Sequence, residues 1–183
     1  MPNEIYICVD VETAGPVPGQ YAMLSIGACL VEDIHTNFYI ELQPDRNESL
    51  PEALAISGLS LQGLQQTGCP PQAAMQAFAD WVRSVTPQDW RPVFVALNAP
   101  FDWTFINDYF HRYLGHNPFG HSALDIKAFY MGLTGVSWSE TSMKHISAHV
   151  AEEKMLLHNA LQDAQDQAEI FREILYQSKS ENK

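Results

Sequence analysis

The sequence of 183 residues contains few basic side chains. Ten lysines and arginines stand against 22 aspartates and glutamates, so the formal net charge is −12 at pH 7. Affinity for a phosphate backbone comes mainly from lysine and arginine side chains that replace condensed counterions. The composition therefore argues against a nucleic-acid-binding protein of the usual basic kind, and against attraction to anionic membranes.

Cysteines and long apolar runs are also scarce. The three cysteines, Cys8, Cys29 and Cys69, show no CxxC spacing, so neither a disulfide framework nor a zinc site is expected. No apolar stretch approaches the roughly 18 to 20 residues of a membrane span, and the N-terminus lacks the pattern of a signal peptide. These absences predict a soluble, cytoplasmic protein without a membrane partner.

The remaining composition is that of one folded domain. The chain is 46% hydrophobic and 17% charged, which is enough apolar material for a sizeable core. It contains no internal repeat and no linker-like stretch. We expect a single domain over residues 1–178, followed by a polar tail at residues 179–183.

Hydrophobic patterning predicts a mixed α/β domain. Three strands come first, the second and third as a possible hairpin, and later strands alternate with helices. Between the third strand and the next helix we expect one or two short helices. The predicted strands are residues 5–12, 22–32, 38–42 and 92–97, and the predicted longer helices are residues 72–85, 101–114, 123–132, 142–149 and 159–176.

Asp10 and Glu12 lie at the C-terminal end of the first predicted strand. Because side chains alternate along a strand, residues two apart project from one face, about 6 to 7 Å apart along the backbone. Two anions at the end of a buried run require cations, and carboxylate oxygens suit Mg²⁺ or Mn²⁺. An isolated DxE is more often a solvated strand end, so this motif is weak by itself.

Asp102 follows the strand predicted at residues 92–97, near the first turn of a helix. The helix dipole favours an acid there, so capping explains Asp102 as well as catalysis does. Ligands of α/β sheets tend to bind at the carboxyl ends of strands, which favours a functional site.

His158 and Asp163 open the last predicted helix. Asp163 lies between the core positions Ala160 and Ala164, so it borders the buried face. The positive end of the helix discourages protonation of His158 and keeps the imidazole available as a base. A single histidine in this position would more often be a surface residue than a catalyst.

Taken in order, these motifs resemble the DEDDh branch of the DnaQ-like 3′–5′ exonucleases, which have a ribonuclease H-like fold. The resemblance covers about residues 4–176 and implies an α/β domain with a central mixed five-stranded sheet flanked by helices. The matching catalytic residues are Asp10, Glu12, Asp102, His158 and Asp163.

The resemblance also implies a chemistry. Two Mg²⁺ or Mn²⁺ ions per active site would lie between the four carboxylates, and His158 would remove a proton from the attacking water. A nucleoside 5′-monophosphate would leave from the 3′ end. Thr13, Ala14 and Gly15 resemble the family's contact to the terminal nucleotide. Phe101 and Trp103, which flank Asp102, could stack on a terminal base.

The substrate stays open within this class. The substrate would be a single-stranded or short oligonucleotide of DNA or RNA. The sequence does not distinguish the two, because it does not reveal a contact to the 2′-hydroxyl group. An exoribonuclease that degrades short RNA or trims RNA 3′ ends is one alternative, and a phosphatase of small esters is another. A non-catalytic interaction module with the same fold is less consistent with four clustered acids. Many relatives dimerise, so a homodimer is an option.

The charge balance limits how such a substrate could be held. The ten basic residues are dispersed along the chain and form no run that could grip a long backbone. We therefore expect metal ions, rather than a basic groove, to hold the scissile phosphate. Action should be distributive, on short or single-stranded ends.

Overall fold

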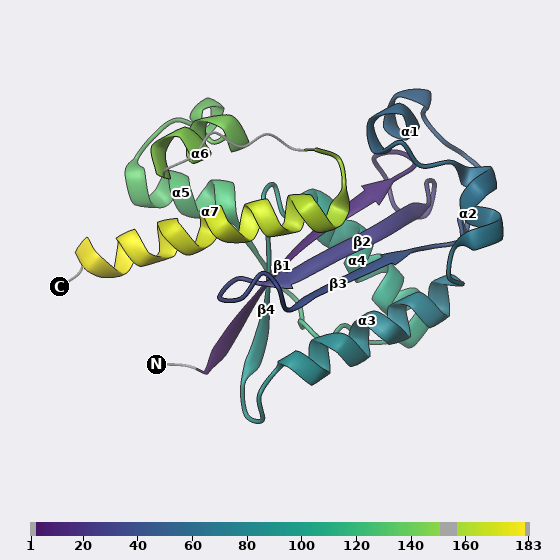
Figure 1. The fold of residues 1–183 in the computed structure, drawn as a ribbon, viewed down its shortest axis with the longest axis horizontal. Helices are drawn as coiled ribbons and strands as arrows, with labels where there is room; N and C mark the ends of the chain where they lie inside the picture. Colours follow the sequence, from purple (N-terminus) through teal and green to yellow (C-terminus); the bar gives the residue numbers. More distant parts are fainter. Residues whose placement is uncertain (1–2, 151–156, 182–183) are drawn as a thin grey trace.

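A computed structural model describes residues 3–150 and 157–181. Its centre is one sheet of five strands in the order β3-β2-β1-β4-β5. The first three strands form an antiparallel meander, whereas β4 lies parallel to β1 and β5 parallel to β4 (Figure 1). The strands are β1 (Glu4–Thr13), β2 (Met23–Leu30), β3 (Asn37–Glu41), β4 (Arg91–Ala96) and β5 (Ala123–Asp125).

Helices cover both faces of this sheet. The long α7 crosses one face together with α5 and α6, and α3 and α4 pack on the other (Figure 1). The helices are α1 (Pro51–Ser57), α2 (Leu61–Thr67), α3 (Pro71–Val85), α4 (Pro100–Leu114), α5 (Ile126–Thr134), α6 (Met143–Val150) and α7 (Ala160–Glu181), together with a 3₁₀ turn, η1 (Trp138–Glu140). In the part of the chain that the structure describes, no helix combines the length and hydropathy needed to cross a membrane.

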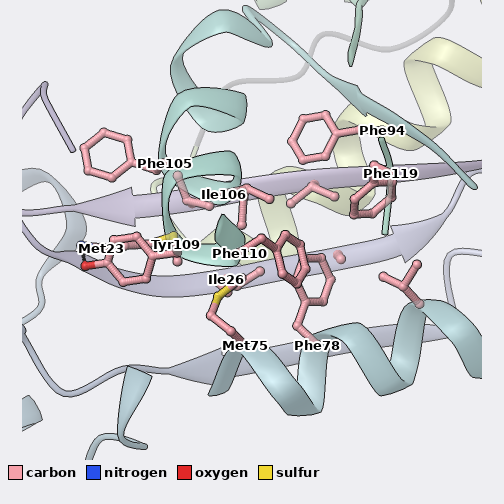
Figure 2. Close-up of a cluster of buried hydrophobic side chains, with 14 of the residues drawn as sticks. Met23, Ile26, Met75, Phe78, Phe94, Phe105, Ile106, Tyr109, Phe110 and Phe119 are labelled. Atoms are coloured by element: carbon pink, nitrogen blue, oxygen red, sulfur yellow. Dashed lines mark hydrogen bonds between the residues drawn. The ribbon is translucent and has the colours of Figure 1, made fainter. Parts of the chain in front are cut away.

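The larger core lies between the sheet and the helices α3 and α4. Phe78 of α3 stacks on Phe110 of α4, with ring centroids 5.6 Å apart (Figure 2). It also stacks on Phe38 of β3, at 5.2 Å. Aromatic pairs in offset stacks contribute about 0.5 to 1.5 kcal/mol beyond the area that they bury. This core therefore fixes α4, whose first turn carries Asp102, against the sheet.

Alternation along β1 separates the core from the polar residues. Ile7, Val9 and Val11 point into the larger core, while Cys8 belongs to the cluster under α7. Asp10 and Glu12 share the parity of Cys8, so they project from the α7 face of the sheet, as the sequence predicts.

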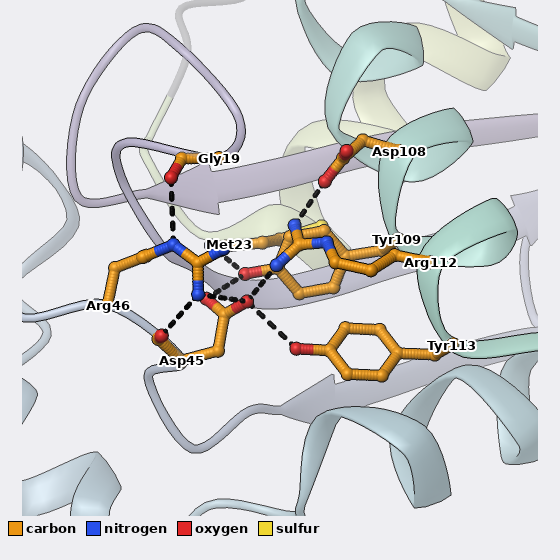
Figure 3. Close-up of polar contacts among 8 residues, drawn as sticks. All are labelled: Gly19, Met23, Asp45, Arg46, Asp108, Tyr109, Arg112 and Tyr113. Carbon is orange, nitrogen blue, oxygen red and sulfur yellow. Dashed lines mark hydrogen bonds and ion pairs between the residues drawn. The ribbon is translucent and has the colours of Figure 1, made fainter.

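Asp45 ties the segment after β3 to α4. Its Oδ1 accepts a hydrogen bond from the Tyr109 hydroxyl at 2.7 Å, and its Oδ2 accepts one from the Tyr113 hydroxyl at 2.8 Å. Arg112 pairs with the same carboxylate, and the Arg46 guanidinium lies 3.6 Å from it (Figure 3). These partners outweigh the effect of burial and hold the pKa of Asp45 below its ordinary value. We call these residues the Asp45 cluster.

The fold confirms the predicted mixed five-stranded sheet, with two differences in its elements. The helix predicted over residues 123–132 is wrong at its start, because residues 123–125 pair with β4 as the short edge strand β5. The last helix continues to Glu181, beyond the predicted boundary of a polar tail at residue 179. Pairing with a neighbouring strand, which short apolar runs do not reveal, decided the first difference.

Candidate active site

The cleft begins where two parallel strands separate. β1 pairs with β4 only as far as Cys8 and Val95, whereas its pairing with β2 continues to Thr13. Two side chains take over backbone hydrogen bonds at the opening. The Leu97 N–H donates to Gln167 Oε1 at 2.8 Å, and the Val11 N–H donates to Asp102 Oδ1 at 3.1 Å. The edge of β1 is thus left open toward the solvent without unpaired donors at these two positions.

A cleft of about 500 Å³ lies at this edge, beside the carboxyl ends of β1 and β4. All five residues of the DEDDh-like set line it, although three separate parts of the chain supply them. They are Asp10, Glu12, Asp102, His158 and Asp163. This is the position where α/β sheets generally bind ligands.

Asp10 is held by one hydrogen bond from α7. The Gln167 Nε2 donates to Asp10 Oδ1 at 2.8 Å, and the amide orientation is fixed because Gln167 Oε1 accepts the Leu97 N–H. Gln167 is only 1% exposed, so its side chain has little freedom. The second oxygen of Asp10 remains available to a ligand.

Asp163 is held by the turn that precedes α7. Its Oδ1 accepts the Leu157 N–H at 2.7 Å, and its Oδ2 accepts the His158 N–H at 2.8 Å. His158 has a φ of 56°, an uncommon value for a residue other than glycine. This turn brings the imidazole of His158 beside the carboxylates: ligand atoms of Glu12, His158 and Asp163 all lie within 4.8 Å of one another.

Gly27 allows α7 to approach the sheet this closely. It lies opposite Asp10 on β2, and a Cβ built on it would lie 2.1 Å from the carbonyl carbon of Ala160. Any side chain at this position would push the start of α7 away from β1. The glycine therefore sets the separation between Asp10 and Asp163, which lie on the two elements.

The cleft carboxylates repel one another in a place that water reaches poorly. Burial, and then the charge of Asp163, raise the pKa of Glu12 to about 7. Burial is also the main reason that the pKa of Asp102 rises to about 8, with Glu12 contributing. The pKa values of Asp10 and Asp163 are raised for the same reason, burial first.

This donor set fits divalent metal ions. Within residues 3–150 and 157–181, none of the four carboxylates lies within ion-pair distance of a lysine or arginine. A buried anion without a partner is costly, and hard cations such as Mg²⁺ and Mn²⁺ are the partners that carboxylate oxygens prefer. Burial raises the pKa values of these carboxylates, and no ion pair within the described residues offsets it, so bound cations would supply the missing positive charge.

The predicted nucleotide contacts divide into two groups. Thr13 and Phe101 line the cleft. Ala14, Gly15 and Trp103 are not among the residues that line it. The Ala14 N–H and C=O are bonded to Ala22 and Leu50, and the Gly15 C=O accepts the Thr13 hydroxyl, so none of these backbone groups is presented to the cleft.

Trp103 points into a different part of the molecule. Its ring packs edge-on against Phe94, with centroids 5.2 Å apart, at the margin of the larger core. Phe101 and Trp103 are two residues apart on a helix, and such positions do not share a face. For this reason only one of the two aromatic side chains beside Asp102 reaches the cleft.

Gln167 and Lys127 were not predicted from the sequence, yet both line the cleft. A signal for Gln167 does exist: it follows Asp163 by four residues, which places both on one face of α7. No comparable pattern marks Lys127. It is brought to the cleft because Asp125 accepts hydrogen bonds from the backbone N–H of both Asn98 and Lys127, at 2.9 and 3.3 Å.

Comparison with known proteins places the sequence among nucleases. The sequence model of the Rv2179c-like 3′–5′ exoribonuclease domain matches residues 5–175. The chain is 48% identical over 170 residues to the 3′–5′ DNA exonuclease Cap18 of Escherichia coli, covering 93% of this chain and 91% of that protein. It is 28% identical over 182 residues to ribonuclease T of Baumannia cicadellinicola, covering 92% and 82%.

Solved structures share the fold at low sequence identity. The nuclease domain of 3′hExo, a DEDDh family member bound to rAMP, superposes with a TM-score of 0.79 at 15% identity, covering 94% of this chain and 92% of that one. E. coli exonuclease I in complex with a dT13 oligonucleotide gives a TM-score of 0.71 at 16% identity, covering 92% and 40%. The sheet order and its flanking helices are therefore those of these nucleases.

Proposed function

Because this chain belongs to the Rv2179c-like 3′–5′ exoribonuclease domain family, and is a 3′–5′ exonuclease acting on nucleic acid, we propose that its cleft hydrolyses single-stranded 3′ ends one nucleotide at a time. One observation carries this assignment. Four carboxylates and a histidine from three parts of the chain line one cleft. Within the described residues, no lysine or arginine lies within ion-pair distance of these carboxylates.

Asp10, Glu12, Asp102 and Asp163 would hold two divalent cations, Mg²⁺ or Mn²⁺. Two such ions, when bound, would stabilise the attacking and leaving oxygens of the phosphoryl group that is displaced. The Gln167 amide donates to one oxygen of Asp10 and leaves the other available, and the Val11 N–H donates to Oδ1 of Asp102. The protein thus presents its ligands in fixed orientations before substrate binds.

His158 would act as the general base. Its side chain is exposed, whereas Asp163 beside it is buried, so the imidazole has contact with solvent as well as with the cleft. A proton taken from the attacking water could therefore leave to bulk solvent after each cycle. The His158 N–H bond to Asp163 keeps the backbone of this turn in place during that transfer.

The terminal nucleotide would occupy the part of the cleft between α1 and α4. Phe101 lines it from α4, and Ala53 and Ile56 line it from α1. Ile56 is 54% exposed, so its apolar side chain is available to cover a bound base. A base stacked on Phe101 and covered by Ile56 would leave its phosphate toward Asp10 and Glu12.

Single-stranded DNA is the substrate that we favour. The relative with 48% identity over more than nine tenths of both chains is named a DNA exonuclease. RNA is the second candidate, because the matching family model is described as an exoribonuclease and the second relative is a ribonuclease. A homodimer and a cytoplasmic location remain predictions from the sequence.

The test is a digestion of 5′-labelled DNA and RNA oligomers of equal sequence, two to twenty nucleotides long. We expect a ladder shortened from the 3′ end with Mg²⁺ or Mn²⁺, no cleavage with EDTA, and faster digestion of DNA. Faster digestion of RNA would reverse the substrate assignment. Activity that persists in EDTA after metal removal would contradict the metal site.

The Asp108→Asn variant is a suitable control for this digestion. Asp108 lies on the outer side of α4, where Arg112 is its partner, and it does not line the cleft. The Asp108→Asn variant removes one negative charge, as Asp102→Asn does. A loss of exonuclease activity confined to Asp102→Asn therefore identifies the cleft as the active site. Equal losses in both variants would point to a general effect of charge or stability.

A further inference from the structure

Lys127 is the one lysine or arginine among the described residues that line the cleft. It lies in the first turn of α5, and its backbone N–H donates to Asp125, the same carboxylate that accepts the N–H groups of Asn98 and Ala99. These bonds couple the start of α5 to the loop before Asp102. The position of Lys127 relative to the catalytic wall of the cleft is therefore fixed by the backbone.

The ammonium group of Lys127 rests on an aromatic ring. Its Nζ lies 4.2 Å from the ring centroid of Trp138, and no carboxylate in residues 3–150 or 157–181 forms an ion pair with it. Trp138 belongs to η1 and is 50% exposed. Half of this large aromatic side chain is therefore accessible to a ligand that contacts Lys127.

The turn that carries Trp138 is well anchored. Glu140 Oε2 accepts hydrogen bonds from the Ser137 N–H at 3.0 Å and from the Ser137 hydroxyl at 2.6 Å, and the Glu140 N–H donates to the Ser137 carbonyl at 3.0 Å. The Lys127–Trp138 pair is thus a preformed combination of a cation and an exposed aromatic face. Grooves that bind single-stranded nucleic acid without sequence preference combine these two features.

We propose that Lys127 and Trp138 form a subsite for the nucleotide on the 5′ side of the scissile bond, with its backbone phosphate on Lys127 and its base on Trp138. A 3′-terminal nucleotide has no neighbour beyond it, so the rest of the strand must leave the cleft past its rim. The other walls carry four carboxylates, which repel a phosphate, and Lys127 offers the cation there. This subsite rests on the proposed exonuclease function.

The test compares two substrates that differ only upstream of the scissile phosphate. An oligothymidylate of six nucleotides has a 5′-side nucleotide, whereas the p-nitrophenyl ester of thymidine 5′-phosphate has p-nitrophenolate as its leaving group and no second backbone phosphate. We expect Lys127→Ala and Trp138→Ala each to lower kcat/KM for the oligomer about tenfold more than for the ester, mainly through KM. Lys127→Arg should recover most of the difference.

Salt dependence separates the two residues. Loss of one phosphate contact should reduce the slope of log kcat/KM against log salt by about 0.7 for Lys127→Ala, whereas Trp138→Ala should leave the slope close to that of the unmodified protein. Arg83→Ala is the matched control, because it removes one positive charge from α3, where Arg83 pairs with Asp80 and does not line the cleft.

The outcomes distinguish this subsite from the function on which it rests. If the unmodified protein cleaves neither substrate, the exonuclease assignment fails. If it cleaves both and Lys127→Ala behaves like Arg83→Ala, the subsite is overturned. Equal losses on the oligomer and the ester would also overturn it, since the residue would then act on the terminal nucleotide or on the fold.

Discussion

The carboxylate of Asp45 and the four carboxylates of the cleft have opposite electrostatics. Asp45 accepts hydrogen bonds from two tyrosines and pairs with Arg112, so its pKa is lowered although it is largely buried. In the cleft, the pKa of Glu12 is raised to about 7 and that of Asp102 to about 8, chiefly by burial. The negative charge of Asp45 is balanced by arginines of the same chain, whereas the charges of the cleft carboxylates are balanced only when the protein binds a cation.

This difference indicates that Asp45 contributes to the stability of the fold and that the cleft carboxylates contribute to metal binding. Breaking a pair such as Arg112–Asp45 leaves an uncompensated charge, so the Asp45 cluster should contribute to folding. Removing a carboxylate from the cleft relieves repulsion instead, so the same kind of substitution should make the metal-free protein more stable. Stability and activity should therefore respond in opposite directions at the two places.

Glu12→Gln should give the largest effect. Glu12 has no hydrogen-bond donor among the described residues, so the amide would remove charge with little loss of contact. We expect turnover to fall by about three orders of magnitude, as for loss of a central electrostatic contribution, while the melting temperature in EDTA at pH 8 rises. Activity near that of the unmodified protein, or a lower melting temperature, would contradict the proposal that the cleft carboxylates serve metal binding at a cost in stability.

Gln167→Leu should reduce activity less, by about 10- to 100-fold, the usual effect of losing a residue that orients a metal ligand. The leucine cannot donate to Asp10 or accept from Leu97. The concentration of Mn²⁺ needed for half-maximal thermal stabilisation should rise as well. Gln165→Leu is the control, because its Nε2 donates to the Ile34 carbonyl, away from the cleft; equal effects would show a structural role only.

Asp45→Asn should affect stability and not chemistry. The side chain accepts from two tyrosines and pairs with arginines, and loss of hydrogen bonds to a charged group generally costs about 2 kcal/mol. Urea denaturation should show this decrease, while kcat at a temperature well below the transition stays unchanged. A variant as stable as the unmodified protein would contradict the role of the Asp45 cluster in folding.

The pH dependence of stability tests the same comparison through the direction in which the melting temperature changes. Glu12 and Asp102 have folded-state pKa values of about 7 and about 8, above their ordinary values of 4.5 and 3.8. Such groups contribute fully below the lower value, and their contribution is lost as pH rises through the higher one. The metal-free protein should thus melt lower at pH 8 than at pH 5.

Metal ions should reverse that loss. Added Mg²⁺ should raise the melting temperature at pH 8 and have a smaller effect at pH 5, where Glu12 and Asp102 retain their protons. Asp45 changes in the opposite sense, since its lowered pKa gives stability that is lost only as pH falls through that value. A melting temperature in EDTA that is constant or rises from pH 5 to pH 8 would contradict the raised pKa values.

Local patterns in the sequence predicted much of the fold and of the site. The alternation of Ile7, Val9 and Val11 with Asp10 and Glu12 is a property of any half-buried strand, and it placed the two acids on one face. The sequence predicts a helix where the short strand β5 lies, because the three residues of β5 owe their conformation to pairing with β4. The sequence did not indicate that the Trp103 ring packs against Phe94, whereas Phe101 lines the cleft.

The sequence alone determined the types of residue and the ends of the strands and helices on which they lie, since these depend on contacts a few residues apart. Only the tertiary structure decided that β1 extends beyond its pairing with β4, that Gly27 lets α7 reach Asp10, and that Lys127, which lines the cleft, contacts the ring of Trp138. Those features depend on elements far apart in the chain. The scarcity of basic residues is therefore compatible with a nuclease, because packing puts a lysine at the one place where a strand must pass.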